Sequence, residues 1–133
     1  HHLPRNRKFN EPARYHIPLI FFGDVLKETS RGQKIAGIGS QTDIATTLLK
    51  QLQIADTAFK WGNDLLNPSR KRFAFYTFDD GFAWLTAKDT LIFDNRAKRL
   101  MYPSEKISSL HSDSILTTGK AYMQVLYDAF LKY

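Results

Sequence analysis

Few side chains in this chain are of the types that do chemistry. There is no cysteine, which excludes thiol catalysis, disulfide bonds and thiolate metal sites together. The four histidines are His1, His2, His16 and His111. Only the first two lie close enough in sequence to share a metal ion, and a lone loop histidine such as His111 is usually just exposed. The histidines therefore predict no metal site within the chain.

Two adjacent carboxylates, Asp79 and Asp80, could act as metal ligands or as an acid and base pair. Gly81 follows them directly, and Asp-Asp-Gly between two apolar segments is typical of a hairpin turn, so a turn role is favoured. The sequence also contains no Gly-x-Ser-x-Gly elbow, no His-Glu-x-x-His zinc helix and no calcium loop. We therefore predict no catalytic residue.

Basic residues are the remaining candidates. The formal net charge of +6 favours anionic partners such as nucleic acid, phosphate or sulfate esters and lipid headgroups, although solvated lysines explain it equally well. The residues before position 15 include Arg5, Arg7, Lys8 and Arg14. Their guanidinium groups could make bidentate contacts to a phosphate or sulfate, whereas a hydrated chain end is the commoner fate of such segments. For the basic cluster at 70–72, a solvated loop is favoured over a nucleic-acid patch.

The first predicted secondary-structure element is the apolar run Arg14–Gly23, RYHIPLIFFG. Its length and its boundaries predict a strand buried on both faces. Pro18 cannot donate a ladder hydrogen bond, so we expect an edge strand or a bulge. Residues 1–13 would form a basic arm that leads into this strand.

A helix is predicted next, from Ser40 to about Leu52. The Gly37-Ile38-Gly39 run before it lacks the further features of a dinucleotide or phosphate loop. Ser40 with Asp43 three residues later forms a capping-box pattern. The apolar side chains then recur at helical spacing, which predicts a core-facing stripe made of Ile44, Ala45, Leu48, Leu49 and Leu52. Residues 14–54 thus read as strand, loop and helix.

The pattern changes to short strands and tight turns at residue 73. The predicted strands are Phe73–Phe78, Phe82–Thr86, Thr90–Phe93 and Arg99–Tyr102. Connections this short cannot cross over, so residues 73–102 should form an antiparallel meander. A Ser-rich loop and a C-terminal helix at 118–133 would follow. That helix is expected to cover one face of the meander with a broad apolar face, made of the line Ala121, Val125, Ala129 and Tyr133 and the flanking residues Tyr122, Leu126 and Phe130.

These elements together predict an α/β fold in a single unit of 133 residues. The composition, 43% hydrophobic and 14% aromatic, is sufficient for a core. No stretch approaches the roughly 20 apolar residues that cross a bilayer. Aromatic residues on the meander could also stack bases as RNA-binding sheets do, but no aromatic motif of that kind is present.

The order of the motifs carries a family resemblance. The segments, in chain order, are HHLPRNRKFNEPARYHIPLIFFG, IGSQTDIATTLLKQLQI, WGNDLLNPSRKRFAFYTFDDGFAWLT and LIFDN. This succession resembles the C-terminal portion of a sulfatase-like catalytic domain in the alkaline phosphatase superfamily, within the lipoteichoic-acid-synthase and phosphoglycerol-transferase branch. It covers nearly the whole chain, and the match is looser beyond about Asn95.

The resemblance implies a parent enzyme that is metal-dependent and acts on phosphate or sulfate esters as a hydrolase or phosphoglycerol transferase. A metal-activated Thr or Ser hydroxyl would attack the ester, with manganese, magnesium, calcium or zinc as the metal. In that family the nucleophile and an acidic metal ligand lie far upstream, and an Asp-His pair lies just before the point where this chain begins. The chain alone is therefore expected to be inactive and to bind no metal.

The same resemblance implies partners, a location and a site. The partners would be the upstream part of the same catalytic domain and an anionic ester substrate, at the extracytoplasmic face of a bacterial membrane. Self-association through an exposed edge or apolar face is also expected. The substrate-side groups would be His2, Arg5 and Arg7, with only the arginines remaining if His1 and His2 belong to an affinity tag. No nucleic acid is expected, but the rival class is a basic binding module for nucleic acid or an acidic polymer.

Overall fold

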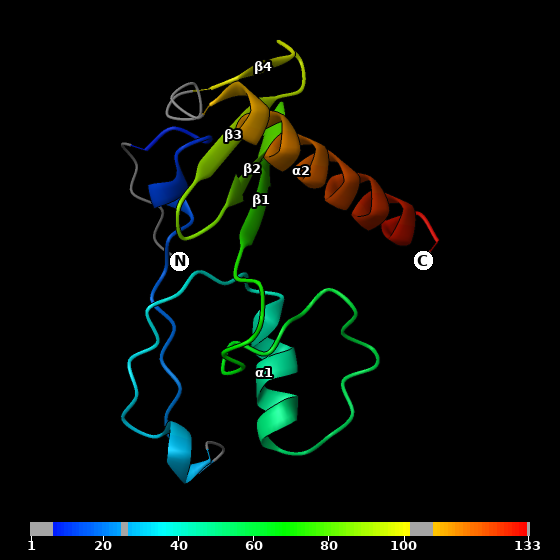
Figure 1. Cartoon of the computed structure of the whole chain (residues 1–133). Helices are drawn as coiled ribbons and strands as arrows, with labels where there is room; N and C mark the ends of the chain where they lie inside the picture. The colour runs from blue at the N-terminus through cyan, green and yellow to red at the C-terminus, as the bar shows by residue number, and fades with distance from the viewer. Residues whose placement is uncertain (1–6, 25–26, 102–107, 133) are drawn as a thin grey trace. The chain divides into compact units, whose positions relative to one another are not determined.

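The computed structural model describes residues 7–24, 27–101 and 108–132. Two compact units make up the chain: His1–His16 together with Phe75–Tyr133, and Ile17–Ala74. The described residues form two α-helices, two short 3₁₀ helices and one four-stranded sheet, a mixed α/β fold (Figure 1).

The sheet belongs to the first unit and confirms the predicted meander. Its strands, in chain order, are β1 (Ala74–Phe78), β2 (Gly81–Leu85), β3 (Thr90–Asp94) and β4 (Arg99–Leu100). The spatial order is β1-β2-β3-β4, and the β2 to β3 register pairs Gly81 with Asp94 and Leu85 with Thr90. Each strand therefore pairs with its neighbour in sequence, as the short connections require.

Side chains of the turn residues stabilise two of the hairpins. The Thr86 hydroxyl accepts hydrogen bonds from the backbone N–H groups of Lys88 (3.3 Å) and Asp89 (3.0 Å). After β3, Asp94 Oδ1 accepts from the N–H groups of Arg96 (2.9 Å) and Ala97 (2.8 Å). These are the local bonds that make Thr and Asp common in turns, and they explain why the hairpins can be predicted from sequence.

Helix α2 (Ser109–Phe130) covers one face of the sheet. Its Gly119 lies directly against the ring of Phe82, a fully buried residue of β2. On the next turn the Tyr122 ring meets Phe75 edge-on at 5.0 Å and Trp84 at 5.5 Å between centroids. The aromatic contacts between α2 and strands β1 and β2 adjoin the buried core of this unit, which lies mainly on β2 and β3 and consists of Phe82, Ala83, Trp84, Leu91, Ile92, Phe93 and Ile115.

The predicted C-terminal helix is right in kind, wrong in its start and only partly right in its face, because Tyr122 of the predicted apolar face does pack on the sheet. Helix α2 begins at Ser109, so the segment expected to be a Ser-rich loop up to residue 118 is largely helical. Ser112 and Ile115 are buried, whereas Ala121 and Val125 are exposed. Small serine and glycine residues allow the helix to approach the sheet closely, and this tertiary packing outweighs their low helix propensity. No helix among the described residues is long and apolar enough to cross a membrane.

The predicted buried strand at Arg14–Gly23 is wrong. Residues 12–14 form a 3₁₀ helix, and residues 17–22 take part in no β-ladder. Ile20 and Phe22 are 77% and 85% exposed. An apolar run predicts burial only where a neighbouring strand can pair with it, and Pro18 also removes one ladder donor. The four strands of the described sheet all come from residues 74–100.

In the second unit, helix α1 (Asp43–Gln51) confirms the predicted helix but not its predicted core face. The buried residues are polar, namely Asp43, Thr46 and Thr47. Four members of the expected apolar stripe, Ile44, Ala45, Leu48 and Leu49, are largely but not fully buried, and Leu52 is 49% exposed at the C-cap position just after the helix. The helical periodicity therefore predicted helix α1 correctly, but the side of α1 that the rest of this unit buries most completely is the polar one.

The contact between Gly119 and Phe82 gives a first prediction. A Gly119→Val substitution would place a side chain into the Phe82 ring and should lower the free energy of unfolding by about 1–3 kcal/mol through overpacking. Thr118→Val at the exposed neighbouring position is the matched control and should change it by under about 0.5 kcal/mol. Both free energies of unfolding are measured by urea titration with Trp84 fluorescence as the signal, in proteins in which Trp61 is replaced by Phe. Equal stability of the two variants would contradict the tight contact.

Candidate functional site

The basic arm, defined here as residues 7–15, contains the one predicted substrate-side residue that the structure describes, Arg7. His2 and Arg5 lie outside the described residues. The arm is folded in the first unit: the N–H of Glu11 bonds to the carbonyl of Lys8 (3.1 Å), and the N–H of Tyr15 bonds to that of Pro12 (2.9 Å). The arm is therefore a structured segment and not a hydrated chain end (Figure 1).

The Arg7 side chain is half exposed, and its backbone carbonyl is held by a hydrogen bond. Its side chain is 52% exposed, and Nη1 lies 3.6 Å from a carboxylate oxygen of Glu11. An exposed pair at this distance contributes little, so the cation remains available to an external anion. Arg14 Nη1 donates to the Arg7 carbonyl at 3.0 Å. The Arg14 guanidinium carbon also sits 4.1 Å above the centre of the Phe9 ring, a cation–π contact.

Two stacked tyrosines attach the arm to the sheet. The rings of Tyr15 and Tyr76 are nearly parallel, with centroids 3.9 Å apart and an interplanar angle of 20°. The Tyr15 hydroxyl donates to the carbonyl of Phe9 at 2.7 Å, and the Tyr76 hydroxyl donates to that of Asn10 at 2.9 Å. Burial, and secondarily the neighbouring Tyr15, raise the pKa of Tyr76 above its ordinary value of 10.0.

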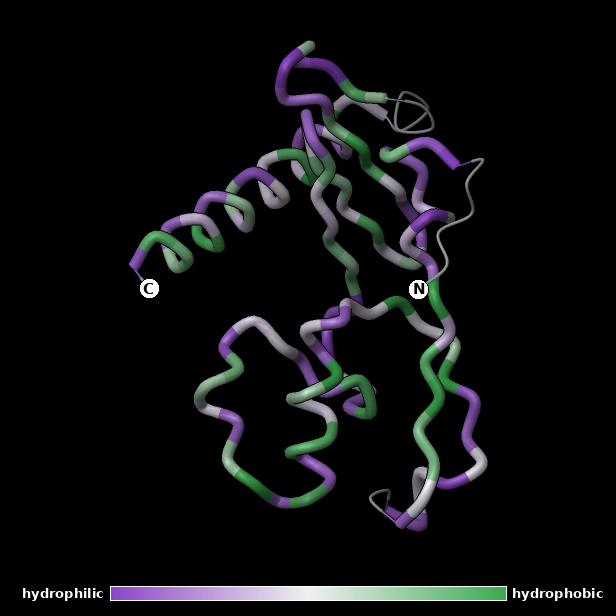
Figure 2. The backbone as a smooth tube through the Cα atoms, turned by 180° about the vertical axis from the view of Figure 1, so that it is seen from behind, coloured by the Kyte–Doolittle hydropathy of each residue, from purple (hydrophilic) through white to green (hydrophobic). Residues whose placement is uncertain are grey.

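The arm lies against the sheet face opposite to α2. Phe75 faces α2, so the next residue along β1, Tyr76, must point to the other face. The Asn10 amide also approaches the sulfur of Met101, at 3.6 Å, just after β4. The strands thus lie between the arm and α2, and both faces of the sheet carry a covering layer (Figures 1 and 2).

The other candidate residues of the sequence do not gather into a site. Asp79 and Asp80 are exposed in the β1–β2 turn, as predicted. His111 Nε2 lies 3.0 Å from a carboxylate oxygen of Asp89 in an exposed pair, on α2 instead of a loop. Among the described residues no group of three or more His, Asp or Glu could hold a metal ion.

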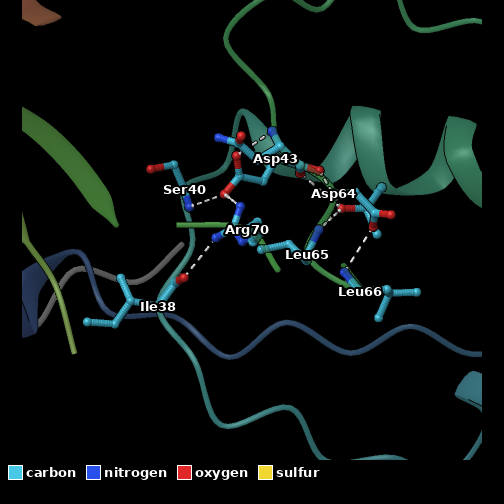
Figure 3. Close-up of polar contacts among 9 residues, drawn as sticks. Ile38, Ser40, Asp43, Asp64, Leu65, Leu66 and Arg70 are labelled. Atoms are coloured by element: carbon cyan, nitrogen blue, oxygen red, sulfur yellow. Dashed lines mark hydrogen bonds and ion pairs between the residues drawn. The ribbon is translucent and has the colours of Figure 1, made fainter. Parts of the chain in front are cut away.

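A buried ion pair holds the second unit together, and it involves a residue of the basic cluster at 70–72. Asp43 and Arg70 have side chains that are only 3% and 5% exposed, and Arg70 Nη1 donates to Asp43 Oδ2 at 3.0 Å (Figure 3). The same carboxylate accepts from the N–H groups of Ser40 (2.9 Å) and Asn63 (2.8 Å). Arg70 Nη2 donates to the carbonyl of Ile38 at 2.9 Å.

One turn further along α1, the Thr47 hydroxyl extends this contact. It donates to the carbonyl of Asp43 (2.7 Å) and accepts from the N–H of Leu65 (2.9 Å). Residues four apart lie on one helix face, so Asp43 and Thr47 together bind the backbone of the 63–65 segment. The predicted capping box is half present, because Asp43 accepts from Ser40 but Ser40 is not the N-cap residue. The buried carboxylate accepts from three donors, so this network positions the chain.

Sequence reasoning missed Tyr15, Tyr76 and Arg70. Each was visible as a residue type, but its partner is remote: Tyr76 and its acceptor Asn10 are 66 residues apart, and Arg70 and Asp43 are 27 apart. One signal was present for Arg70, because an acidic residue on a predicted helix and an arginine in a connector of the same region can pair. For the tyrosines no local pattern existed.

The buried ion pair gives a second prediction. Asp43→Asn keeps the side-chain shape but leaves the Arg70 charge buried without a partner, so α1 should lose about 3 kcal/mol of stability against opening. Asp56→Asn, in the more exposed pair with Lys50, is the control and should leave α1 nearly unchanged. Native-state hydrogen exchange of the α1 amides measures both. Similar exchange rates in the two variants would show that the pair is not structural.

Ionisation of Tyr76 gives a third prediction. Its pKa is raised in the folded state, so its contribution to stability is complete below the unfolded value of 10.0 and is lost as the pH rises above it. The free energy of unfolding should therefore fall as the pH rises above about 10. The fall should be smaller in Tyr76→Phe, measured by urea unfolding at each pH. An identical pH dependence in both proteins would mean that Tyr76 is not buried against the arm.

Comparison with protein-family models, with curated proteins and with solved structures gives no match for this chain.

Proposed function

We propose that the chain is the C-terminal part of a metal-dependent sulfatase-like domain that hydrolyses phosphate or sulfate esters or transfers phosphoglycerol, and that its basic arm contributes to the binding of the anionic substrate. The proposal rests on the resemblance of the ordered motifs quoted above. The structural observation that carries it is that the arm is folded onto the sheet with the Arg7 side chain half exposed.

The chemistry of the arm fits an anionic ester. Arg7, Lys8 and Arg14 contribute three positive charges within eight residues, and Glu11 contributes one negative charge. Guanidinium groups match the geometry of phosphate and sulfate oxygens. The arm's backbone is already ordered, so an anion that binds to Arg7 does not have to order the backbone, which lowers the entropic cost of binding.

The metal ion would be held elsewhere in the parent domain. The described residues supply no set of ligands that fits one, so we derive no catalytic step for this chain. Its role in the parent would be structural and substrate-binding, and the chain alone would be inactive. Its partners would be the upstream part of the domain and an anionic ester, at the extracytoplasmic face of a bacterial membrane.

The rival function, a binding module for nucleic acid, is less well supported by the site. An aromatic sheet that stacks bases must present its rings to solvent. Here Phe75, Phe82 and Trp84 pack under α2, and Tyr76 is stacked on Tyr15. In the second basic cluster, Arg70 is buried in its ion pair with Asp43.

The test is anion binding at the arm. We expect inorganic phosphate and glycerol 1-phosphate, titrated at constant ionic strength, to shift the backbone amide NMR resonances of Lys8 and Glu11 in the arm, which remain observable in every variant. Arg7→Ala should weaken the binding roughly tenfold, as loss of one charge-assisted contact does. Arg96→Ala, an exposed arginine in the β3–β4 turn with the same charge loss, is the matched control and should bind as the unaltered chain does.

Two further measurements separate the rival functions. Aryl phosphate and aryl sulfate esters should show no turnover by this chain with added manganese, magnesium or zinc. Clear metal-dependent turnover would overturn the view that the catalytic residues lie elsewhere. Tight binding of an oligonucleotide that weakens steeply as salt rises, together with no phosphate effect at the arm, would favour the nucleic-acid module.

A further inference from the structure

The stacked pair of Tyr15 and Tyr76 makes more directed contacts than are needed merely to attach the arm to the sheet. Two hydroxyl groups donate to two consecutive carbonyls, those of Phe9 and Asn10, at 2.7 and 2.9 Å. Ring stacking at 3.9 Å fixes the position of one hydroxyl relative to the other. One tyrosine comes from the arm itself and the other from β1, so the pair sets where on the sheet this stretch of the arm lies.

The position of the Arg7 backbone depends in turn on the residues that the two tyrosines hold. Phe9, whose carbonyl Tyr15 holds, carries the ring on which the Arg14 guanidinium lies, at 4.1 Å. Arg14 in turn donates to the Arg7 carbonyl at 3.0 Å. The Arg7 backbone is thus fixed through two residues, while its side chain stays 52% exposed. Removal of the hydroxyl groups should free the arm without altering any charge.

We propose that Tyr15 and Tyr76 are positioning residues for anion binding, a tyrosine clamp that holds the arm in the conformation in which Arg7 meets the phosphate or sulfate group of the substrate. This inference rests on the proposed function, because it assigns a purpose to the geometry of the same arm. It adds that the affinity for an anion depends on two uncharged side chains that need not touch the anion.

A positioning role for the two tyrosines and a merely structural role can be distinguished, because they predict different experimental results. A structural pair would change the stability of the arm alone. A positioning pair links arm docking to anion affinity, because an arm that is partly released binds its ligand more weakly in proportion to the docked fraction. The linkage is reciprocal, so a bound anion must also favour the docked arm.

The experiment uses Tyr15→Phe, Tyr76→Phe and the double variant, all of which keep the stacked rings. Tyr127→Phe, at an exposed position on α2, is the matched control. Arm release is measured as the rate of tryptic cleavage after Lys8 and Arg14, with cleavage after Arg96 as an internal reference. Anion affinity is measured by titration with inorganic phosphate, observed at the backbone amide resonances of Lys8 and Glu11, which are present in every variant including Arg7→Ala.

We expect cleavage of the arm to rise roughly 2- to 10-fold for each hydroxyl removed, the effect of one neutral hydrogen bond. The double variant should also bind phosphate more weakly, and phosphate should slow cleavage of the arm in the unaltered chain. In Arg7→Ala, phosphate should no longer protect the arm although the clamp is intact. Tyr127→Phe should behave as the unaltered chain in both assays.

The clamp would be overturned if the double variant were cleaved at the original rate, or were cleaved faster yet bound phosphate with unchanged affinity. The proposed function fails in a different way. If the unaltered chain binds no phosphate, or if Arg7→Ala binds it equally well, the arm is not an anion site, and the positioning role is overturned with it. In that case faster cleavage of the double variant would still show that the hydroxyl groups hold the arm, as a structural attachment only.

Discussion

The close contact between Gly119 and the Phe82 ring is the constraint on which the first unit depends. It brings α2 down onto the meander, which allows Tyr122 to meet Phe75 and Trp84 and excludes water from that face. Because strand residues alternate, placing Phe75 under the helix directs Tyr76 to the opposite face. The arm binds there. The position of the candidate anion-binding residue thus follows from the packing of an aromatic core on the other side of the sheet.

The second unit is organised by polar contacts. A carboxylate buried on the helix would be unfavourable by itself, and Asp43 is tolerated because three donors reach it, one of them the charged Arg70. These contacts connect the start of α1 to the backbone at Asn63, directly, and to the backbone at Ile38, through Arg70. It leaves the apolar stripe of α1 only partly covered. Burial in this unit is therefore directed by hydrogen bonding more than by hydrophobicity.

Two arginine side chains, one in each unit, differ in how far they are buried. Arg70 is buried and paired with Asp43, so its charge serves the fold, whereas Arg7 is half exposed and pairs with Glu11 at 3.6 Å near the surface. A count of positive charges along the sequence does not distinguish these cases. The geometry does, and it is the reason why the proposed anion site is at the arm and not at the second basic cluster.

The sequence by itself determined the meander, its turns and the existence of both helices, because these depend on residues close in the chain: Thr86 and Asp94 bond to their own turns, and short connections allow only antiparallel neighbours. It also marked Arg7 as a candidate. Three outcomes required the folded chain: which side of α1 is buried, the absence of residues 17–22 from any ladder, and the attachment of the arm by Tyr76. The first and the third depend on partners 27 and 66 residues away, and local periodicity carries no information about such distant pairings.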